Sequence, residues 1–180
     1  MLRIIGGKHR SRVIQTPDEG TVPTKNRVRE ALFSALSDLL PRASVLDLFA
    51  GSGALGIEAL SRGAKEATFV DSSPIAARII ASNLRLLGEE GEVINLDYQQ
   101  ALQRLKGKSF DIVFLDPPYA QKEFYGKAIS LLEEGGLLSP GAALVIEYEG
   151  ECPLSFDIGY SARYYKYGYT RVCIARKVTK

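Results

Sequence analysis

Short apolar runs alternate with amphipathic stretches along most of the chain, and most runs end at a glycine, a proline or an acidic residue. Short runs rich in valine, isoleucine and phenylalanine are typical of buried strands, whereas apolar positions three and four residues apart are typical of helices. By these criteria strands are predicted at residues 45–49, 66–71, 92–96, 110–115, 142–148, 160–167 and 169–175. Helices are predicted at residues 25–40, 54–60, 74–87, 98–105 and 123–133.

Strand and helix alternate between residues 45 and 148, which predicts a parallel sheet with helices on both faces. The last two runs meet at Gly168, so they are expected to form a hairpin. We therefore predict an α/β protein with a Rossmann-like, mostly parallel seven-stranded sheet whose last strand is antiparallel.

The start of the chain lies outside this pattern. Residues 2–7 and 11–15 are predicted to form a small β-hairpin around Gly6 and Gly7, and residues 16–23, which contain two prolines, are predicted to form a linker. The predicted division is a basic hairpin extension with its linker at residues 1–23 and a main domain at residues 24–180.

Length and composition exclude several classes of protein. A chain of 180 residues that is 46% hydrophobic suits one well-buried α/β domain. No apolar run is long enough to cross a bilayer and the first residues lack the apolar core of a signal peptide, so a cytoplasmic location is expected. Cys152 and Cys173 are isolated and the chain has one histidine, so no metal site is expected.

Basic residues gather near the two ends of the chain, although the net charge is only +2. If the two ends meet in space they would bind a polyanion such as a nucleic acid, whereas otherwise they are simply solvated. The candidate RNA-contacting residues are Lys8, His9, Arg10, Arg12, Lys25, Arg27, Arg29 and Lys166.

The strand at residues 45–49 leads into a glycine-rich turn, residues 50–53, and then into a helix. In an open α/β sheet this junction is a ligand site, and glycine lets a ligand approach the backbone closely. The sequence from Gly51 matches G-x-G-x-x-G, and Asp71 follows Gly51 by twenty residues. Two interpretations are therefore possible, a dinucleotide-binding site and a turn that only connects strand and helix. Asp47 argues against both, because a carboxylate on a buried strand suits a ligand that carries an ammonium group better than a pyrophosphate.

Acidic residues also follow the next strands along the chain. Asp71 is placed to accept from both hydroxyls of a ribose. Asp97 could accept from the amine of an adenine, with Tyr98 packed on the ring. After the strand at residues 110–115 comes Asp-Pro-Pro-Tyr, in which the prolines fix the backbone and leave the carbonyls of Asp116 and Pro117 as rigid acceptors beside an aromatic ring.

This combination resembles the class I methyltransferases that transfer a methyl group from S-adenosylmethionine to exocyclic amines. Three segments are similar to the RsmD family: R-I-I-G-G-K-H-R-S-R at residues 3–12, T-K-N-R-V-R-E-A-L-F at 24–33 and L-D-L-F-A-G-S-G-A-L-G-I-E-A-L at 46–60. The resemblance implies methylation of the 2-amino group of a guanine in 16S rRNA, within a small-subunit particle, by a monomer that needs no metal.

The resemblance also implies roles for particular residues. The cofactor-binding set is Asp47, Phe49, Ala50, Gly51, Ser52, Gly53, Asp71, Ser72, Asp97, Tyr98 and Asp116. The catalytic set is Asp116, Pro117, Pro118 and Tyr119, in which Asp116 and the Pro117 carbonyl accept the two amine hydrogens and Tyr119 stacks on the base. Two other functions remain open: an adenine-N6 methyltransferase of DNA or RNA, and a non-catalytic RNA-binding or ribosome-assembly module.

Overall fold

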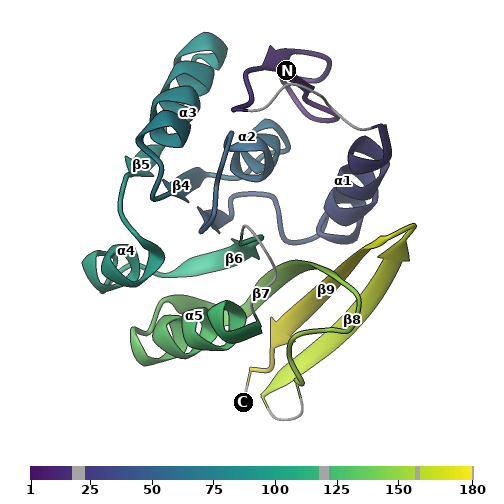
Figure 1. Cartoon of the computed structure of the whole chain (residues 1–180), viewed down its shortest axis with the longest axis vertical. Coiled ribbons are helices and arrows are strands. Elements are labelled where there is room, and N and C mark those ends of the chain that lie inside the picture. Colours follow the sequence, from purple (N-terminus) through teal and green to yellow (C-terminus); the bar gives the residue numbers. More distant parts are fainter. Residues whose placement is uncertain (18–22, 118–121, 157–158, 180) are drawn as a thin grey trace.

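A twisted sheet of seven strands, in the order β5-β4-β3-β6-β7-β9-β8, forms the centre of the protein (Figure 1). The computed structural model describes residues 1–17, 23–117, 122–156 and 159–179. Strands β3 to β7 are mutually parallel, and β9 is antiparallel to both of its neighbours. The predicted fold class is confirmed.

The strands of this sheet are β3 (Ser44–Asp47), β4 (Glu66–Val70), β5 (Glu92–Ile94), β6 (Phe110–Leu115), β7 (Leu138–Glu149), β8 (Tyr160–Tyr167) and β9 (Thr170–Lys177). The helices are α1 (Pro23–Ala35), α2 (Ala54–Ser61), α3 (Pro74–Leu87), α4 (Tyr98–Arg104) and α5 (Lys122–Glu134). Helix α1 is shorter than predicted, because the chain tightens into turns in which the N–H of Leu39 donates to the carbonyl of Leu36. None of the helices within the described ranges is both long and apolar enough to cross a membrane.

The sheet is buried on both faces. Successive side chains of a strand point to opposite faces, so Val45 contributes to one core cluster with α1, α2 and α3, and Leu46 contributes to the other with α4 and α5. In β6, Phe114 belongs to the first of these core clusters and Leu115 to the second. The central strands are therefore held from both sides, which gives the residues at their carboxyl ends a rigid base.

The N-terminal hairpin is present but smaller than predicted. It consists of β1 (Leu2–Arg3) paired with β2 (Val13–Ile14), and the residues between them form a loop that packs on α2. Ile4 and Ile14 lie in the same core cluster as β3 and α1. The division of the chain at residue 23 stays a prediction.

One buried carboxylate attaches this extension to the main sheet. Glu58 of α2 is 1% exposed and accepts hydrogen bonds from the N–H groups of Ile5 and Gly6, at 2.9 and 2.8 Å. Its side chain also accepts from Arg62 Nε at 2.8 Å, and Arg29 Nε lies 3.8 Å from it. Burial lowers the pKa of the Arg29 guanidinium, and the charge of Glu58 opposes that change.

We expect Glu58→Ala to lower the free energy of unfolding by roughly 3–5 kcal/mol, because it leaves a buried arginine without its carboxylate and two backbone N–H groups without an acceptor. Residues 1–17 should also become sensitive to proteases. Urea unfolding and limited proteolysis measure the two effects. Glu134→Ala, at an exposed position in α5, is the control. A loss of stability equal to that of the control would contradict this role for Glu58.

Candidate active site

Three glycines in the loop after β3 and in the first turn of α2 are needed for different reasons. Gly51 has φ of 55° and Gly53 has φ of 77°, in the left-handed region that glycine adopts most readily. A β-carbon added at Gly51 would meet nothing within 4 Å, so the space beside this backbone is open to a ligand. One added at Gly56 would lie 2.4 Å from the ring of Phe69, so Gly56 allows α2 to pack closely on β4.

Asp71 connects this loop to the end of β4. Its Oδ2 accepts from the N–H of Gly51 at 2.8 Å, and its Oδ1 accepts from the N–H of Ser73 at 2.8 Å. Ser73, rather than Asp71, caps α3 by accepting from the N–H of Ala76. Because each carboxylate oxygen has a second acceptor site, Asp71 can still accept from a ligand.

Asp47 is buried beneath the loop at the end of β3. It is 2% exposed, and its Oδ2 accepts from the N–H of Gly56 at 3.0 Å. Burial raises the pKa of Asp47 to about 7, the Gly56 N–H opposes this, and the charge of Asp71 adds to it. A cation bound nearby would favour the ionised form, so this position suits a ligand with an ammonium group.

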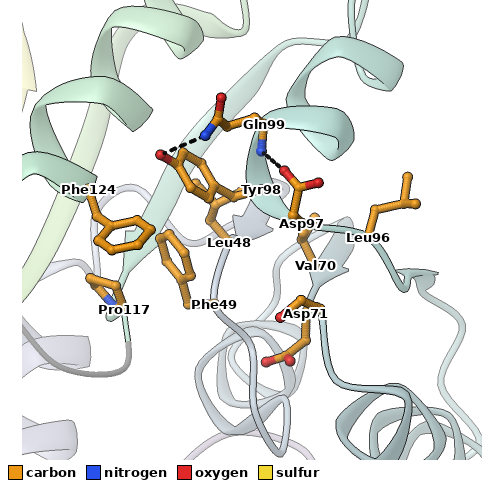
Figure 2. A pocket seen from close by; sticks show the side chains of 11 residues that line it. Leu48, Phe49, Val70, Asp71, Leu96, Asp97, Tyr98, Gln99, Pro117 and Phe124 are labelled. Atoms are coloured by element: carbon orange, nitrogen blue, oxygen red, sulfur yellow. Dashed lines mark hydrogen bonds between the residues drawn. The ribbon is translucent and has the colours of Figure 1, made fainter.

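A cavity of about 350 Å³ opens at the carboxyl ends of β3, β4, β5 and β6. Figure 2 shows Phe49, Tyr98, Phe124 and Pro117 along one side of it, with Asp71 and Asp97 placed apart from them. The Tyr98 ring centroid lies 5.5 Å from that of Phe49 and 5.6 Å from that of Phe124. The remaining lining residues are Leu48, Val70, Ser72, Leu96 and Gln99. An apolar wall with acidic acceptors suits a ligand that has a flat ring and hydroxyl groups.

Asp97 has a structural role as well as a place in the cavity. Its Oδ1 caps α4 by accepting from the N–H groups of Gln99 and Gln100, at 2.9 and 3.1 Å. Within the described residues Oδ2 has no hydrogen-bond partner, so it can accept from a ligand amine. Tyr98 is largely buried, which raises the pKa of its hydroxyl. It thus forms part of the cavity wall.

The Asp-Pro segment after β6 borders the same cavity. Asp116 is exposed, while Pro117 is buried and lines the cavity. Tyr125 of α5, a residue that the sequence analysis did not single out, lies close to Asp116. Burial makes the largest contribution to raising the pKa of the Tyr125 hydroxyl, and the charge of Asp116 adds to it. That hydroxyl donates to the carbonyl of Glu147 at 2.8 Å. Pro118 and Tyr119 lie outside the described residues.

The structure therefore brings together most of the cofactor-binding set. Phe49, Asp71, Ser72, Asp97 and Tyr98 line one cavity. Ala50, Gly51, Ser52 and Gly53 form the adjoining loop, while Asp47 lies beneath it and Asp116 lies outside the lining.

Three basic residues of the extension contact the carboxyl end of α3 and the residues after it. Lys8 and His9 both bind the carboxylate of Glu89, and Arg12 Nη2 donates to the carbonyl of Leu86 at 2.7 Å. Burial would raise the pKa of Glu89, but the hydrogen bonds from Lys8 and His9 outweigh it and the pKa is lowered. Lys8, Arg10 and Arg12 remain exposed.

The other candidate RNA-contacting residues fall into different places. Arg27 and Lys166 are exposed, and the Lys25 side chain lies outside the described part. The role predicted for Arg29 is wrong. Arg29 is 5% exposed, and its guanidinium donates to the carbonyl of Arg3 and faces Glu58, so it holds the extension in place instead of meeting RNA.

Asn83 of α3 is a further residue that sequence reasoning missed. It is fully buried, its Nδ2 donates to the carbonyls of Ser52 and Gln15 at 3.0 Å, and its Oδ1 accepts from the N–H of Gln15 at 2.8 Å. One side chain therefore joins the glycine-rich loop to the extension. An amide within the apolar stripe of a helix was the available signal.

Comparison with known proteins agrees with this geometry. Residues 2–176 match a family described as "Conserved hypothetical protein 95". Ribosomal RNA small subunit methyltransferase D of Escherichia coli is 41% identical over 152 residues, which are 83% of this chain and 76% of that protein. The protein of the same name from Haemophilus influenzae is 41% identical over 85% of this chain and 81% of its own length.

Solved structures show the same fold. The Escherichia coli protein yhhF superposes with a TM-score of 0.88 at 34% identity, over 99% of both chains. The 16S rRNA N2 G1207 methyltransferase of Thermus thermophilus, in complex with AdoMet and guanosine, has a TM-score of 0.71 at 23% identity, over 89% of this chain and 44% of its own, a likeness of fold alone. The chain belongs to the RsmD family, to which it is similar in sequence over most of its length and in fold over almost all of it.

Proposed function

We propose that this protein transfers a methyl group from S-adenosylmethionine to the exocyclic 2-amino group of a guanine in 16S rRNA of the small ribosomal subunit. The observation that carries the proposal is the cavity that Asp71, Asp97 and Pro117 share at the carboxyl edge of the sheet, in a member of the RsmD family. S-adenosylmethionine, when bound, supplies a methyl group activated by a sulfonium.

The residues of the cavity fit that molecule. Asp47 and the open backbone at Gly51 would hold its amino-acid part, because a buried carboxylate attracts the ammonium group. Asp71 would accept from the ribose hydroxyls through its unused acceptor sites. Asp97 Oδ2 would accept from the adenine amine, with Phe49 and Tyr98 packed against the ring.

The Asp-Pro segment would hold the guanine. The amine of guanine is a poor nucleophile because its lone pair is delocalised into the ring. Asp116 and the Pro117 carbonyl would each accept a hydrogen bond from one N–H of this amine. These two hydrogen bonds favour a pyramidal nitrogen and orient its lone pair toward the methyl group. Such a base must leave its stack in the RNA to enter the site, and Tyr119 would stack on it there.

Finer features of the protein belong to the same proposal. Residues 1–23 act as a basic RNA-binding extension, and residues 24–180 form the catalytic domain. The protein works as a monomer in the cytoplasm, and its substrate is a small-subunit particle.

Incubation with labelled S-adenosylmethionine tests the function directly. The substrates are unmethylated small-subunit particles, naked 16S rRNA and DNA, each followed by nucleoside analysis. We expect N2-methylguanosine from rRNA. N6-methyladenosine would identify an adenine methyltransferase, and binding to rRNA without transfer would identify a non-catalytic module.

Asp47→Asn should weaken S-adenosylmethionine binding tenfold or more, on the order of 1.4 kcal/mol. Because the cation binds the ionised carboxylate, the ratio of wild-type to variant affinity should rise from pH 6 to 7.5, around the raised pKa of about 7. Calorimetry at each pH measures this ratio. Protonation of the ligand affects both proteins equally and therefore does not change the ratio. A ratio that stays constant with pH would place the ammonium group elsewhere.

The same substitution should not destabilise the free protein at pH 8. A carboxyl group whose pKa is raised on folding stabilises the fold in full below its unfolded pKa, and that contribution is lost as the pH rises through the folded pKa of about 7. Thermal unfolding without ligand should therefore give Asp47→Asn a midpoint at pH 8 equal to or above that of the wild type. A lower midpoint would show that the carboxylate is needed for folding.

Asp116→Ala should lower the rate of methyl transfer by about 10²-fold or more, because it removes an acceptor that aligns the reacting amine. The dissociation constant for S-adenosylmethionine should change less than about threefold, because Asp116 lies outside the cavity lining. Single-turnover assays and calorimetry separate these effects. Glu123→Ala, at an exposed acid nearby, is the control. Near wild-type transfer by Asp116→Ala would contradict its role.

Replacing Lys8, Arg10 and Arg12 together by alanine should weaken rRNA binding and reduce the magnitude of its salt dependence by about 2 in slope, because fewer phosphates are neutralised. Filter binding from 50 to 200 mM salt measures the slope. An unchanged slope would show that these residues of the extension do not contact the RNA phosphates.

A further inference from the structure

The turn between β8 and β9 lies at the same edge of the sheet as the cavity. Strand β7 is parallel to β6, and β9 is antiparallel to both β7 and β8, so β8 runs in the direction of β6 and ends at the carboxyl edge. Leu115, the last residue of β6, is in register with Ile146 of β7. Two residues further along β7, Tyr148 is opposite Arg171 of β9, which is in turn opposite Lys166 of β8. With strands about 4.8 Å apart, Arg171 lies roughly 10 Å and Lys166 roughly 14 Å from the line of β6 and its Asp-Pro extension.

Two cations therefore stand side by side at this edge. Lys166 and Arg171 are directly opposite each other, a placement that is unfavourable for like charges. Neither forms an ion pair with any residue in the described ranges. The acids near the end of β7, Glu147 and Glu149, are in register with Val172 and Thr170 and so point to the other face.

Tyr169 extends from the turn beside this pair. It is 94% exposed, and Gly168, with φ of 62°, starts the two-residue turn that places Tyr169 at the tip of the hairpin. Tyr165 and Tyr167 differ from it, because their rings stack on each other and pack against the core. Tyr169 thus offers a free aromatic face.

Protection of the sheet edge does not explain this arrangement. A charged residue on the edge strand β8 is enough to discourage pairing with another sheet, and Lys166 and Arg163 already provide that. Arg171 lies on the inner strand β9, where protection of the edge does not call for a charge. An RNA strand, with regular phosphates and unpaired bases, matches both the cations and the exposed ring.

We propose that Lys166, Arg171 and Tyr169 form a second RNA-contact surface, on the far side of the cavity from the N-terminal extension. Lys166 and Arg171 bind phosphates next to the target nucleotide, and Tyr169 stacks on a neighbouring unpaired base. The extension contacts α2 and α3, whereas β8 is the outermost strand at the other end of the sheet (Figure 1). The turn between β8 and β9 therefore places an RNA contact at the carboxyl edge itself, the edge at which the base enters the site. This inference rests on the proposed function.

The test compares two double variants of the full-length protein on unmethylated 16S rRNA and small-subunit particles. Lys166→Ala/Arg171→Ala removes the pair. Arg104→Ala/Lys106→Ala removes the same charge from exposed positions at the end of α4 and in the segment that follows it. We expect the first to raise the KM for rRNA about tenfold and to reduce the salt-dependence slope of binding by about 1.5, with the affinity for S-adenosylmethionine unchanged. The control should leave the KM for rRNA within about twofold of the wild-type value, and the salt-dependence slope within about 0.3 of it.

Tyr169 is tested in the same assay. Tyr169→Ala should raise the KM for rRNA about fivefold or more, and Tyr169→Phe should keep the wild-type value because stacking needs only the ring. Wild-type KM and slope in Lys166→Ala/Arg171→Ala would overturn the inference while leaving the proposed function intact. A wild-type dimer that the double variant or Tyr169→Ala dissociates would also overturn it, because the surface would then bind a second copy. If the wild-type protein methylates no rRNA, the proposed function and this inference both fail.

Discussion

The parallel alignment of β3, β4, β5 and β6 is the constraint on which the rest of the site depends. Each strand ends at the same edge of the sheet, and each end carries an acidic residue that is far from the others in sequence. The hydrogen bond from the Gly51 N–H to Asp71 joins the first two of these ends directly. The cavity lies at these strand ends, and the first residues of α4 and α5 complete its wall.

The order of strands and helices and the places where strands end could be predicted because they depend on local patterns. A buried parallel strand has to be apolar throughout, so an acid or a glycine at its end is conspicuous in the sequence. The predictions for Asp71 and Asp97 relied on this rule, and both residues line one cavity. The length of α1 was missed because the apolar spacing continues into turns that no longer follow the helical geometry.

Interactions between distant segments could not be predicted in the same way. Arg29 looks like any other basic residue near the start of a helix, and only the fold shows that Glu58 lies behind it. Asn83 is an ordinary polar residue in the sequence, and its importance comes from two loops that meet at its side chain. Asp47 was noticed because a carboxylate is unusual on a buried strand, but its raised pKa depends on the depth of burial and on the nearby charge of Asp71.

Several backbone N–H and C=O groups of the extension are bound by three polar side chains of α2 and α3. Glu58 binds the N–H groups of Ile5 and Gly6, Ser61 receives the N–H of His9, and Asn83 binds both backbone groups of Gln15. Backbone contacts of this kind do not depend on which side chains the extension carries. The outward-facing side chains, such as Arg10, can therefore change as the RNA surface changes during evolution, while the loop remains in place against α2 and α3. For these backbone contacts the constraint on sequence falls on Glu58 and Asn83, more than fifty residues away from the segment that they hold.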